Sequence, residues 1–280
     1  MQSVAIIGAG ELGGAVAHVL ARRDVVRSIV LVDETGRVAT GKALDIAQAA
    51  PVEQFSTDLS GSTDISSAAG VSVVILADRA GGSDWQGDEG FLMLRRVAQM
   101  ASSAVILCAG ASQRELVDRG VRELHLSRTR VFGSAPEAFA NGARALAALA
   151  INGSPRDVAL SVLGVPPAHL VIPWESATAA GRSLSHALDE PTRRQLAARI
   201  AAMWPPGPYA LASAATAVIE SMQGRSRRLA SCFVAPDTTA GTRTKTAALP
   251  VRLSASGIAG VVLPSLSVVE QIALDNATKL

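Results

Sequence analysis

Residues 3–13 read SVAIIGAGELG, and this stretch decides the fold. A short apolar run with the length of a buried strand is followed at once by glycines at the spacing G-x-G-x-x-G. A helical pattern over residues 11–22 comes next. A strand, a glycine turn and a helix in this order form the first unit of a doubly wound α/β domain. The turn is therefore predicted to bind a ligand that contains phosphate groups.

The glycine turn has a different physical requirement at each of its positions. Gly8 permits the tight turn, Gly10 lets the backbone approach a diphosphate, and Gly13 lets the helix pack closely against the strand. The N-terminus of the helix then favours a bound anion. The predicted cofactor-binding residues are Gly8, Gly10, Glu11, Leu12, Gly13 and Asp33.

Asp33 ends the next apolar run, SIVLVD, twenty residues after Gly13. A carboxylate at this position accepts hydrogen bonds from the ribose hydroxyls of NAD and would repel the 2′-phosphate of NADP. Arg37 follows four residues later, and its positive charge would weaken that preference. NAD is therefore the predicted cofactor, and NADP is less favoured.

The chain changes its pattern near residue 134. Before it, the strand-like runs SVAIIG, SIVLVD, VSVVILA, AVILCA and RVFG alternate with helical patterns near residues 11–22, 36–49, 91–101 and 112–124. After it come helical patterns over 137–151, 191–203 and 209–222 and the strand-like segments DVALSVLGV, SCFVAP and LPVRLSASGIAGVVLP. We expect a Rossmann-type doubly wound parallel sheet over residues 1–133 and a mixed α+β domain for substrate binding or oligomerisation over residues 134–280.

Composition narrows the class of protein. Although 49% of the residues are hydrophobic, no uninterrupted apolar stretch approaches the roughly 18 residues of a spanning helix. The N-terminus lacks the basic region of a signal peptide, and the two cysteines lie in apolar surroundings that are typical of buried thiols. We therefore expect a cytoplasmic protein without a membrane partner.

The same composition argues against nucleic acids and metals as ligands. The net charge is only +2, and aromatic residues, on which bases could stack, make up 3% of the chain. No spacing of His, Cys, Asp and Glu is typical of a metal site, and no G-x-S-x-G motif indicates a serine nucleophile.

The segment after Asp33, DETGRVATGKALDIAQAAPVEQF, resembles the malate-type members of the lactate and malate dehydrogenase family. Those enzymes carry a G-K-A-L-D helix followed by S/A-P-V. Further similar segments are GSTDISSAAGVSVVILA, RVFGSA, ATAVIE and LPVRLSASGIAGVV. The resemblance implies an NAD-dependent oxidoreductase that moves a hydride between nicotinamide and a small 2-hydroxy acid. It also implies a homodimer or homotetramer, with the helix containing GKALDIAQAA at one interface.

The catalytic half departs from the family's pattern. The family's mechanism uses a histidine to move the hydroxyl proton, an aspartate to orient that histidine, and arginines to hold the carboxylate. In the alignment without a gap, Phe139 stands at the aspartate position, Gly142 at an arginine position and Pro166 at the histidine position. The family's arginine-rich loop is replaced by DRAGGSDWQGDEG, with Arg79 at its base and Trp85 at its tip.

Two hypotheses follow and stay open. In the first, the chain binds NAD or NADH but lacks the usual hydride transfer, and serves as a regulator, a sensor or a subunit partner. In the second, it is an active NAD-dependent oxidoreductase with a rebuilt site for a different small hydroxy or keto substrate. The candidate catalytic residues are then His169, Asn141 and Arg79, together with Asp84 and Glu137. All five are expected on segments that face the nicotinamide end of the cofactor. Trp85 is expected to cover a ligand or to contact another subunit.

Overall fold

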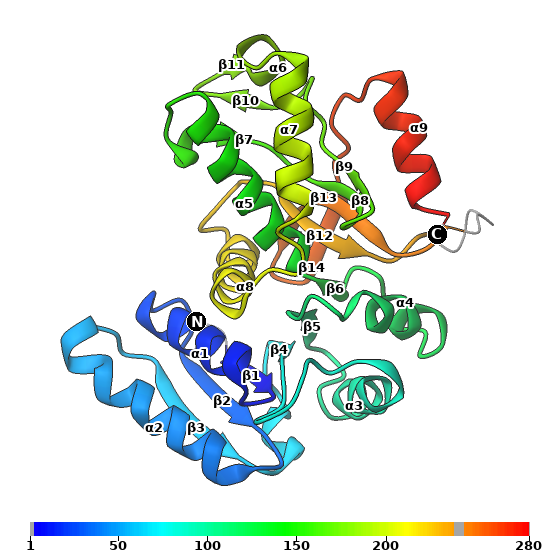
Figure 1. Ribbon diagram of the computed structural model, residues 1–280. Coiled ribbons are helices and arrows are strands. Elements are labelled where there is room, and N and C mark those ends of the chain that lie inside the picture. Colours follow the sequence, from blue (N-terminus) through cyan, green and yellow to red (C-terminus); the bar gives the residue numbers. More distant parts are fainter. Residues whose placement is uncertain (1–2, 238–243, 280) are drawn as a thin grey trace.

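The computed structural model describes residues 3–237 and 244–279, and it begins with the parallel sheet that the sequence predicts (Figure 1). The strands are β1 (Ser3–Ile7), β2 (Ser28–Val32), β3 (Asp58–Ser62), β4 (Val73–Leu76), β5 (Val105–Cys108) and β6 (Val131–Gly133). They pair in the order β3-β2-β1-β4-β5-β6. The order reverses between β1 and β4, which is where doubly wound sheets bind their ligands, beyond the carboxyl ends of the strands.

Helices bury this sheet on both faces. They are α1 (Glu11–Arg22), α2 (Gly36–Glu53), α3 (Gly87–Met100) and α4 (Arg114–Arg122), with a short 3₁₀ helix η1 (Ile65–Ala68). Val4 and Ile6 of β1 belong to the apolar cluster that contains α1 and α2, whereas Ala5 and Ile7 belong to the cluster that contains α3 and α4. Successive side chains of a strand point to opposite faces, so β1 contributes to both layers.

The second half of the chain extends the same sheet in the antiparallel direction. Phe233 of β12 (Ala230–Val234) pairs with Gly133 of β6, and β13 (Ala247–Ser254) pairs with β12. The other strands are β7 (Val158–Ala159), β8 (Leu163–Val165), β9 (His169–Val171), β10 (Thr178–Ala179), β11 (Arg182–Ser183) and β14 (Gly257–Val261). The helices are α5 (Ala135–Ala150), η2 (Pro155–Asp157), α6 (Leu184–Ala187), α7 (Glu190–Ala201), α8 (Pro208–Met222) and α9 (Val268–Ala277).

The fold class predicted from the sequence is confirmed, and the differences are local. Strand β3, with the sequence DLSGS, lies at the edge of the sheet, where a polar strand is tolerated and carries no apolar signal. The predicted strand DVALSVLGV is interrupted after β7, and the amide of Val162 bonds to the hydroxyl of Ser231. Helix α2 continues four residues beyond the predicted end and stops at Gln54, which has a left-handed backbone.

Strand β6 ends at Gly133 and α5 begins at Ala135, where the sequence predicts the boundary between residues 1–133 and 134–280. The sheet runs across this point through the pairing of β6 with β12. The division into two domains therefore stays a prediction. Across residues 3–237 and 244–279, no helix combines the length and apolar character needed to cross a membrane.

Candidate functional site

The glycine turn between β1 and α1 is held so tightly that side chains are excluded. Gly8 has a φ of +108°, and a Cβ added there would overlap the backbone carbonyl of Asp78. A Cβ at Gly13 would overlap the carbonyl oxygen of Gly8, and a Cβ at Gly10 would overlap the Asp78 carboxylate. At each of the three glycines, the surrounding atoms therefore leave no space for a side chain.

The N-terminus of α1 is occupied by the side chain of Asp78. The amide of Leu12 donates to Asp78 Oδ2 over 3.1 Å, and the amide of Gly13 donates to Oδ1 over 2.8 Å. The amide of Gly10 donates to the Asp78 main-chain carbonyl over 3.0 Å. The residue is 8% exposed. A carboxylate from the end of β4 therefore satisfies amides that the first turn of a helix leaves without an intrahelical partner.

Asp33 lies buried at the end of β2, beside the same turn. Its Oδ2 accepts hydrogen bonds from the amides of Ala9, over 2.8 Å, and Ala80, over 2.9 Å, and its Oδ1 accepts one from Thr35, over 2.9 Å. Burial raises the pKa of the carboxyl, but the three amides together outweigh burial and hold the pKa below its ordinary value. Asp33 is thus ionised at neutral pH, as a ribose-binding carboxylate must be.

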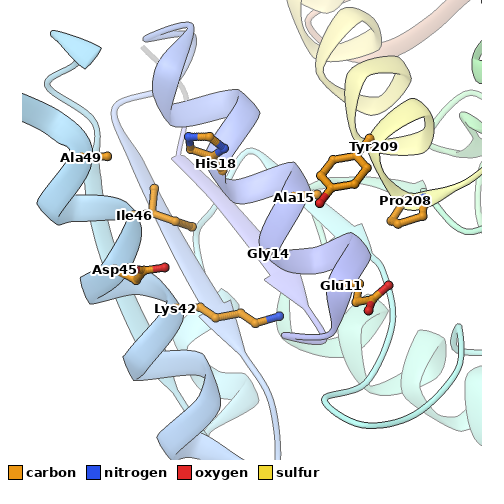
Figure 2. Close-up of a pocket in the computed structure, with 10 residues that line it drawn as sticks. All are labelled: Glu11, Gly14, Ala15, His18, Lys42, Asp45, Ile46, Ala49, Pro208 and Tyr209. Atoms are coloured by element: carbon orange, nitrogen blue, oxygen red, sulfur yellow. The ribbon is translucent and has the colours of Figure 1, made fainter. Parts of the chain in front are cut away.

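Three cavities surround the turn. The first, of about 660 Å³, runs between α1 and α2, and Figure 2 shows Lys42 reaching across it toward the start of α1. The Lys42 ammonium donates a hydrogen bond to the carbonyl of Gly10. The second cavity, of about 580 Å³, lies over the turn and is lined by residues of the turn, Thr35, Val38, Lys42 and residues 78–82. The third, of about 310 Å³, includes Glu11, Asp78, Asp84, Ser112, Pro205 and Pro206.

The segment after β4 folds back onto the turn. Asp78 and Asp84 form an isolated antiparallel bridge, and the Trp85 indole donates to the carbonyl of Ile7 over 3.2 Å. Trp85 is 7% exposed, and the guanidinium of Arg79 lies 5.1 Å from its ring centre. The expectation that Trp85 is an exposed loop tip that covers a ligand or meets another subunit was wrong, because the apolar ring is buried under the turn.

Asp84 is a partly buried acid beside the third cavity. Its Oδ2 accepts a hydrogen bond from the amide of Ser112 over 3.2 Å. Burial raises the pKa of the Asp84 carboxyl above its ordinary value, the hydrogen bond from Ser112 opposes this shift, and repulsion by Asp78 adds to it. Within the described part of the chain, no group of three or more His, Cys, Asp or Glu side chains could hold a metal ion.

The positions that the resemblance assigns to an aspartate and an arginine lie in an apolar cluster. The ring of Phe139 packs edge-on against Trp204 with 5.5 Å between centres, and Trp204 packs against Phe233 at 6.1 Å. A Cβ added at Gly142 would lie 2.7 Å from the terminal methyl of Met203. The connection between α7 and α8 therefore fills the space where charged side chains would stand, and the adjacent prolines 205 and 206 line the third cavity.

One candidate catalytic residue, Glu137, belongs to a buried ion pair within α5, and a second, Asn141, bonds to the arginine of that pair. Arg144 donates to Glu137 Oε1 over 2.5 Å and to Asn141 Oδ1 over 2.6 Å, and its Nε donates to the carbonyl of Leu160 over 2.8 Å. The other Glu137 oxygen accepts from the amide of Ser231 over 2.7 Å. Glu137 thus joins α5 to β12, whereas Asn141 bonds within α5, and neither is among the residues that line the three cavities.

His169 and Arg79 lie in different parts of the molecule. His169 is an exposed residue of β9, opposite Val165 in the hairpin at the far end of the large sheet from β1. Figure 1 shows this hairpin beside α9, away from α1. Arg79 lines the second cavity and pairs with Glu89 over 2.7 Å. Of the candidates, only Arg79 and Asp84 border the glycine turn.

Sequence reasoning missed two residues that the structure places at the turn. Asp78 follows β4 after one residue, at the carboxyl end of a parallel strand beside the reversal of strand order, and that position was the available signal. Lys42 belongs to the GKALD segment, and the sequence alone gives it no role at the turn. Its contact with Gly10 depends on how α2 packs beside α1, which the sequence pattern does not give.

Comparison with known proteins places this site in a family. Residues 2–88 match the family described as lactate/malate dehydrogenase, NAD binding domain. The malate dehydrogenase of Desulforudis audaxviator is 27% identical over 297 residues, which cover 99% of this chain and 95% of that one.

Solved structures agree on the fold. The malate dehydrogenase from Salinibacter ruber has a TM-score of 0.85 at 22% identity, with 98% of this chain and 93% of that chain covered. The lactate dehydrogenase from Cryptosporidium parvum, complexed with lactic acid and nicotinamide adenine dinucleotide, has a TM-score of 0.84 at 20% identity, with 99% and 94% covered. The matched NAD-binding domain supports NAD as the cofactor. With its glycine turn, its ionised Asp33 and these matches along its length, the chain belongs to the lactate/malate dehydrogenase family.

Proposed function

We propose that this protein binds NAD or NADH and lacks the hydride transfer on 2-hydroxy acids after which its family is named. The observation that carries the proposal is the apolar cluster at Phe139 and Gly142. An aspartate and an arginine there would be needed to orient a proton carrier and to hold a carboxylate. Met203 and Trp204 leave a substrate carboxylate without a charged partner at these positions.

The predicted cofactor residues fit a dinucleotide in part. Gly8, Gly10 and Gly13 leave no side chain between the backbone and a ligand, and the ionised Asp33 suits ribose hydroxyls and disfavours NADP. Glu11 and Leu12 open the helix that would face the diphosphate. As Asp78 stands, however, its carboxylate holds the amides of Leu12 and Gly13, so a diphosphate fits only when Asp78 is displaced.

The second candidate function is an oxidoreductase with a rebuilt site, and Asp84 is the observation that favours it. An acid whose pKa is raised by burial, beside a cavity next to the turn, is suited to proton transfer. Bound NAD would supply the hydride acceptor. Arg79 would then contribute a positive charge near the turn. Asn141, which bonds to Arg144, and His169, in the hairpin of β8 and β9, lie away from the turn.

One pair of measurements separates the two functions. Millimolar NADH is expected to raise the melting temperature, since a ligand that binds only the native state stabilises it. NADH absorbance is expected to stay constant with oxaloacetate, pyruvate and a panel of neutral ketones. Turnover of a neutral ketone that Asp84→Asn abolishes would favour the second function. Turnover of oxaloacetate that His169→Ala abolishes would contradict the first.

We further propose that the chain is cytoplasmic and that residues 1–133 and 134–280 form two domains. We also propose that it assembles through α2 as a homodimer, or as a homotetramer built from that dimer. Leu44 of α2 is 59% exposed, and Tyr209 of α8, which lines the cavity beside α2 in Figure 2, is 82% exposed. Leu44→Glu is expected to yield monomers in sedimentation velocity. Leu149→Glu, at an exposed leucine of α5, is the matched control and should leave the dimer intact. Monomeric wild-type protein at micromolar concentration would refute the dimer.

A further inference from the structure

The carboxylate of Asp78 and a bound diphosphate would need the same place. A diphosphate at a glycine turn is held by the backbone amides at the start of the helix. Here the amides of Leu12 and Gly13 already bond to the two oxygens of Asp78, over 3.1 and 2.8 Å. The space that Gly10 leaves by lacking a side chain contains the same carboxylate, since a Cβ built on Gly10 would overlap it.

Electrostatics makes the two anions alternatives. The start of a helix carries roughly half a positive charge, which one anion largely satisfies. A second anion against a buried carboxylate would be repelled in a region where water screens little. Lys42 adds a positive charge beside Gly10, but it comes from the α2 side and leaves the amides with Asp78.

The rest of the segment also covers the ribose position. The amide of Ala80 bonds to Oδ2 of Asp33, the oxygen that also accepts from Ala9. Asp78 and Ala80 therefore occupy the two anchor points of a dinucleotide, the helix start and the ribose carboxylate, through one short stretch of chain. Gly81 follows at once with a φ of +70°, and Gly82 comes next. A pair of glycines lets such a segment change its backbone at low energy.

We propose that residues 78–82, which we name the plug, form an internal competitor of the dinucleotide, with Asp78 in the place of the diphosphate. The inference rests on the proposed binding of NAD and adds the device that regulates it. In the closed state the plug satisfies the turn, and NAD binds only the fraction of molecules in which Asp78 has left. The apparent dissociation constant is raised in proportion to the rarity of that open state.

The test compares Asp78→Gly and Asp78→Asn with the wild type by isothermal titration. NADH and ADP-ribose, which contain the diphosphate, are expected to bind both variants tenfold or more tightly than the wild type. Adenosine, which has no diphosphate to take the place of the Asp78 carboxylate, is expected to gain less affinity than NADH and ADP-ribose. Asp58→Asn is the matched control, because it removes the same charge from the exposed edge strand β3, away from α1, and it should leave all three affinities within threefold.

A second readout separates competition from a general change in the fold. Without ligand, Asp78→Asn is expected to lower the melting temperature, because the amides of Leu12 and Gly13 lose their charged partner. Tighter binding together with lower stability is the signature of a displaced internal ligand. A variant with a damaged fold would instead lose both ligand affinity and stability.

The outcomes also separate the plug from the proposed function. Equal NADH affinity in the wild type and both Asp78 variants overturns the plug and leaves NAD binding standing. Binding by the variants but not by the wild type supports the plug and overturns NAD binding by the native chain. Absence of NADH and ADP-ribose binding in every protein overturns both.

Discussion

At the scale of single residues, apolar side chains occupy the positions that the resemblance assigns to charged groups. Gly8 and Gly13 remain free of side chains, whereas Phe139 and Met203 bring apolar volume to positions where the family needs charge. Restoring a charged group should therefore fail, because the surroundings have become apolar as well.

Phe139→Asp tests this directly. The carboxylate would lie against Trp204 without a partner, so the free energy of unfolding is expected to fall by at least about 3 kcal/mol. Urea unfolding measures the loss, and oxaloacetate turnover is expected to stay absent. Phe139→Leu is the control and should lose less stability. A folded Phe139→Asp protein that reduces oxaloacetate would show that the cluster is not what blocks the chemistry.

Asp84 gives a prediction about pH. Because burial raises the pKa of this carboxyl in the folded protein, its ionisation lowers stability as the pH rises from the unfolded value, about 3.9, through the folded value. Asp84→Asn removes this loss, so it should melt higher than the wild type at pH 7, and the difference should vanish below about pH 4. Melting curves between pH 3.5 and pH 8 measure it. A constant difference over that range would refute the assignment.

At the scale of elements, α5 is tied to its surroundings by the buried pair of Glu137 and Arg144. Their side chains are nearly inaccessible, and the surrounding groups Asn141, Leu160 and Ser231 satisfy the remaining hydrogen bonds. A buried pair of this kind is weak evidence for stability but is sensitive to the loss of one partner.

Arg144→Met is therefore expected to lower the free energy of unfolding by about 3–5 kcal/mol, because Glu137 keeps a buried charge without a partner. The double variant Glu137→Gln with Arg144→Met should recover much of that loss. Arg194→Met is the control, since Arg194 pairs with Glu190 on the exposed face of α7 and should change stability by less than about 1 kcal/mol. Chemical denaturation measures all three, and similar losses at both arginines would contradict the expectation.

At the scale of the whole molecule, the sequence predicts the fold well, because its clearest patterns are ones that the packing of strands and helices requires. The glycine turn, the apolar strands β1, β2, β4 and β5 and the long helices follow from periodicity and sterics. Strand β3 could not be predicted, since its residues are polar and pairing with β2 defines it.

The site was less predictable, since its state depends on contacts between distant segments. The position of Asp78 against Leu12 spans 66 residues, and no local pattern distinguishes a carboxylate that turns inward from one that faces water. The side chains of Glu137 and Asn141 bond to Arg144 within α5 and do not face the turn. Their place in the alignment did not indicate this contact.

The buried indole of Trp85 gives the plug its own optical reporter. The ring bonds to the carbonyl of Ile7 at the end of β1, and it stacks near Arg79, which belongs to the plug. When the plug leaves the turn, the guanidinium leaves the ring, and the fluorescence of Trp85 should change in intensity and wavelength. Stopped-flow mixing with ADP-ribose, with Trp85→Phe as the blank for the emission of Trp174 and Trp204, would then time the opening without any label.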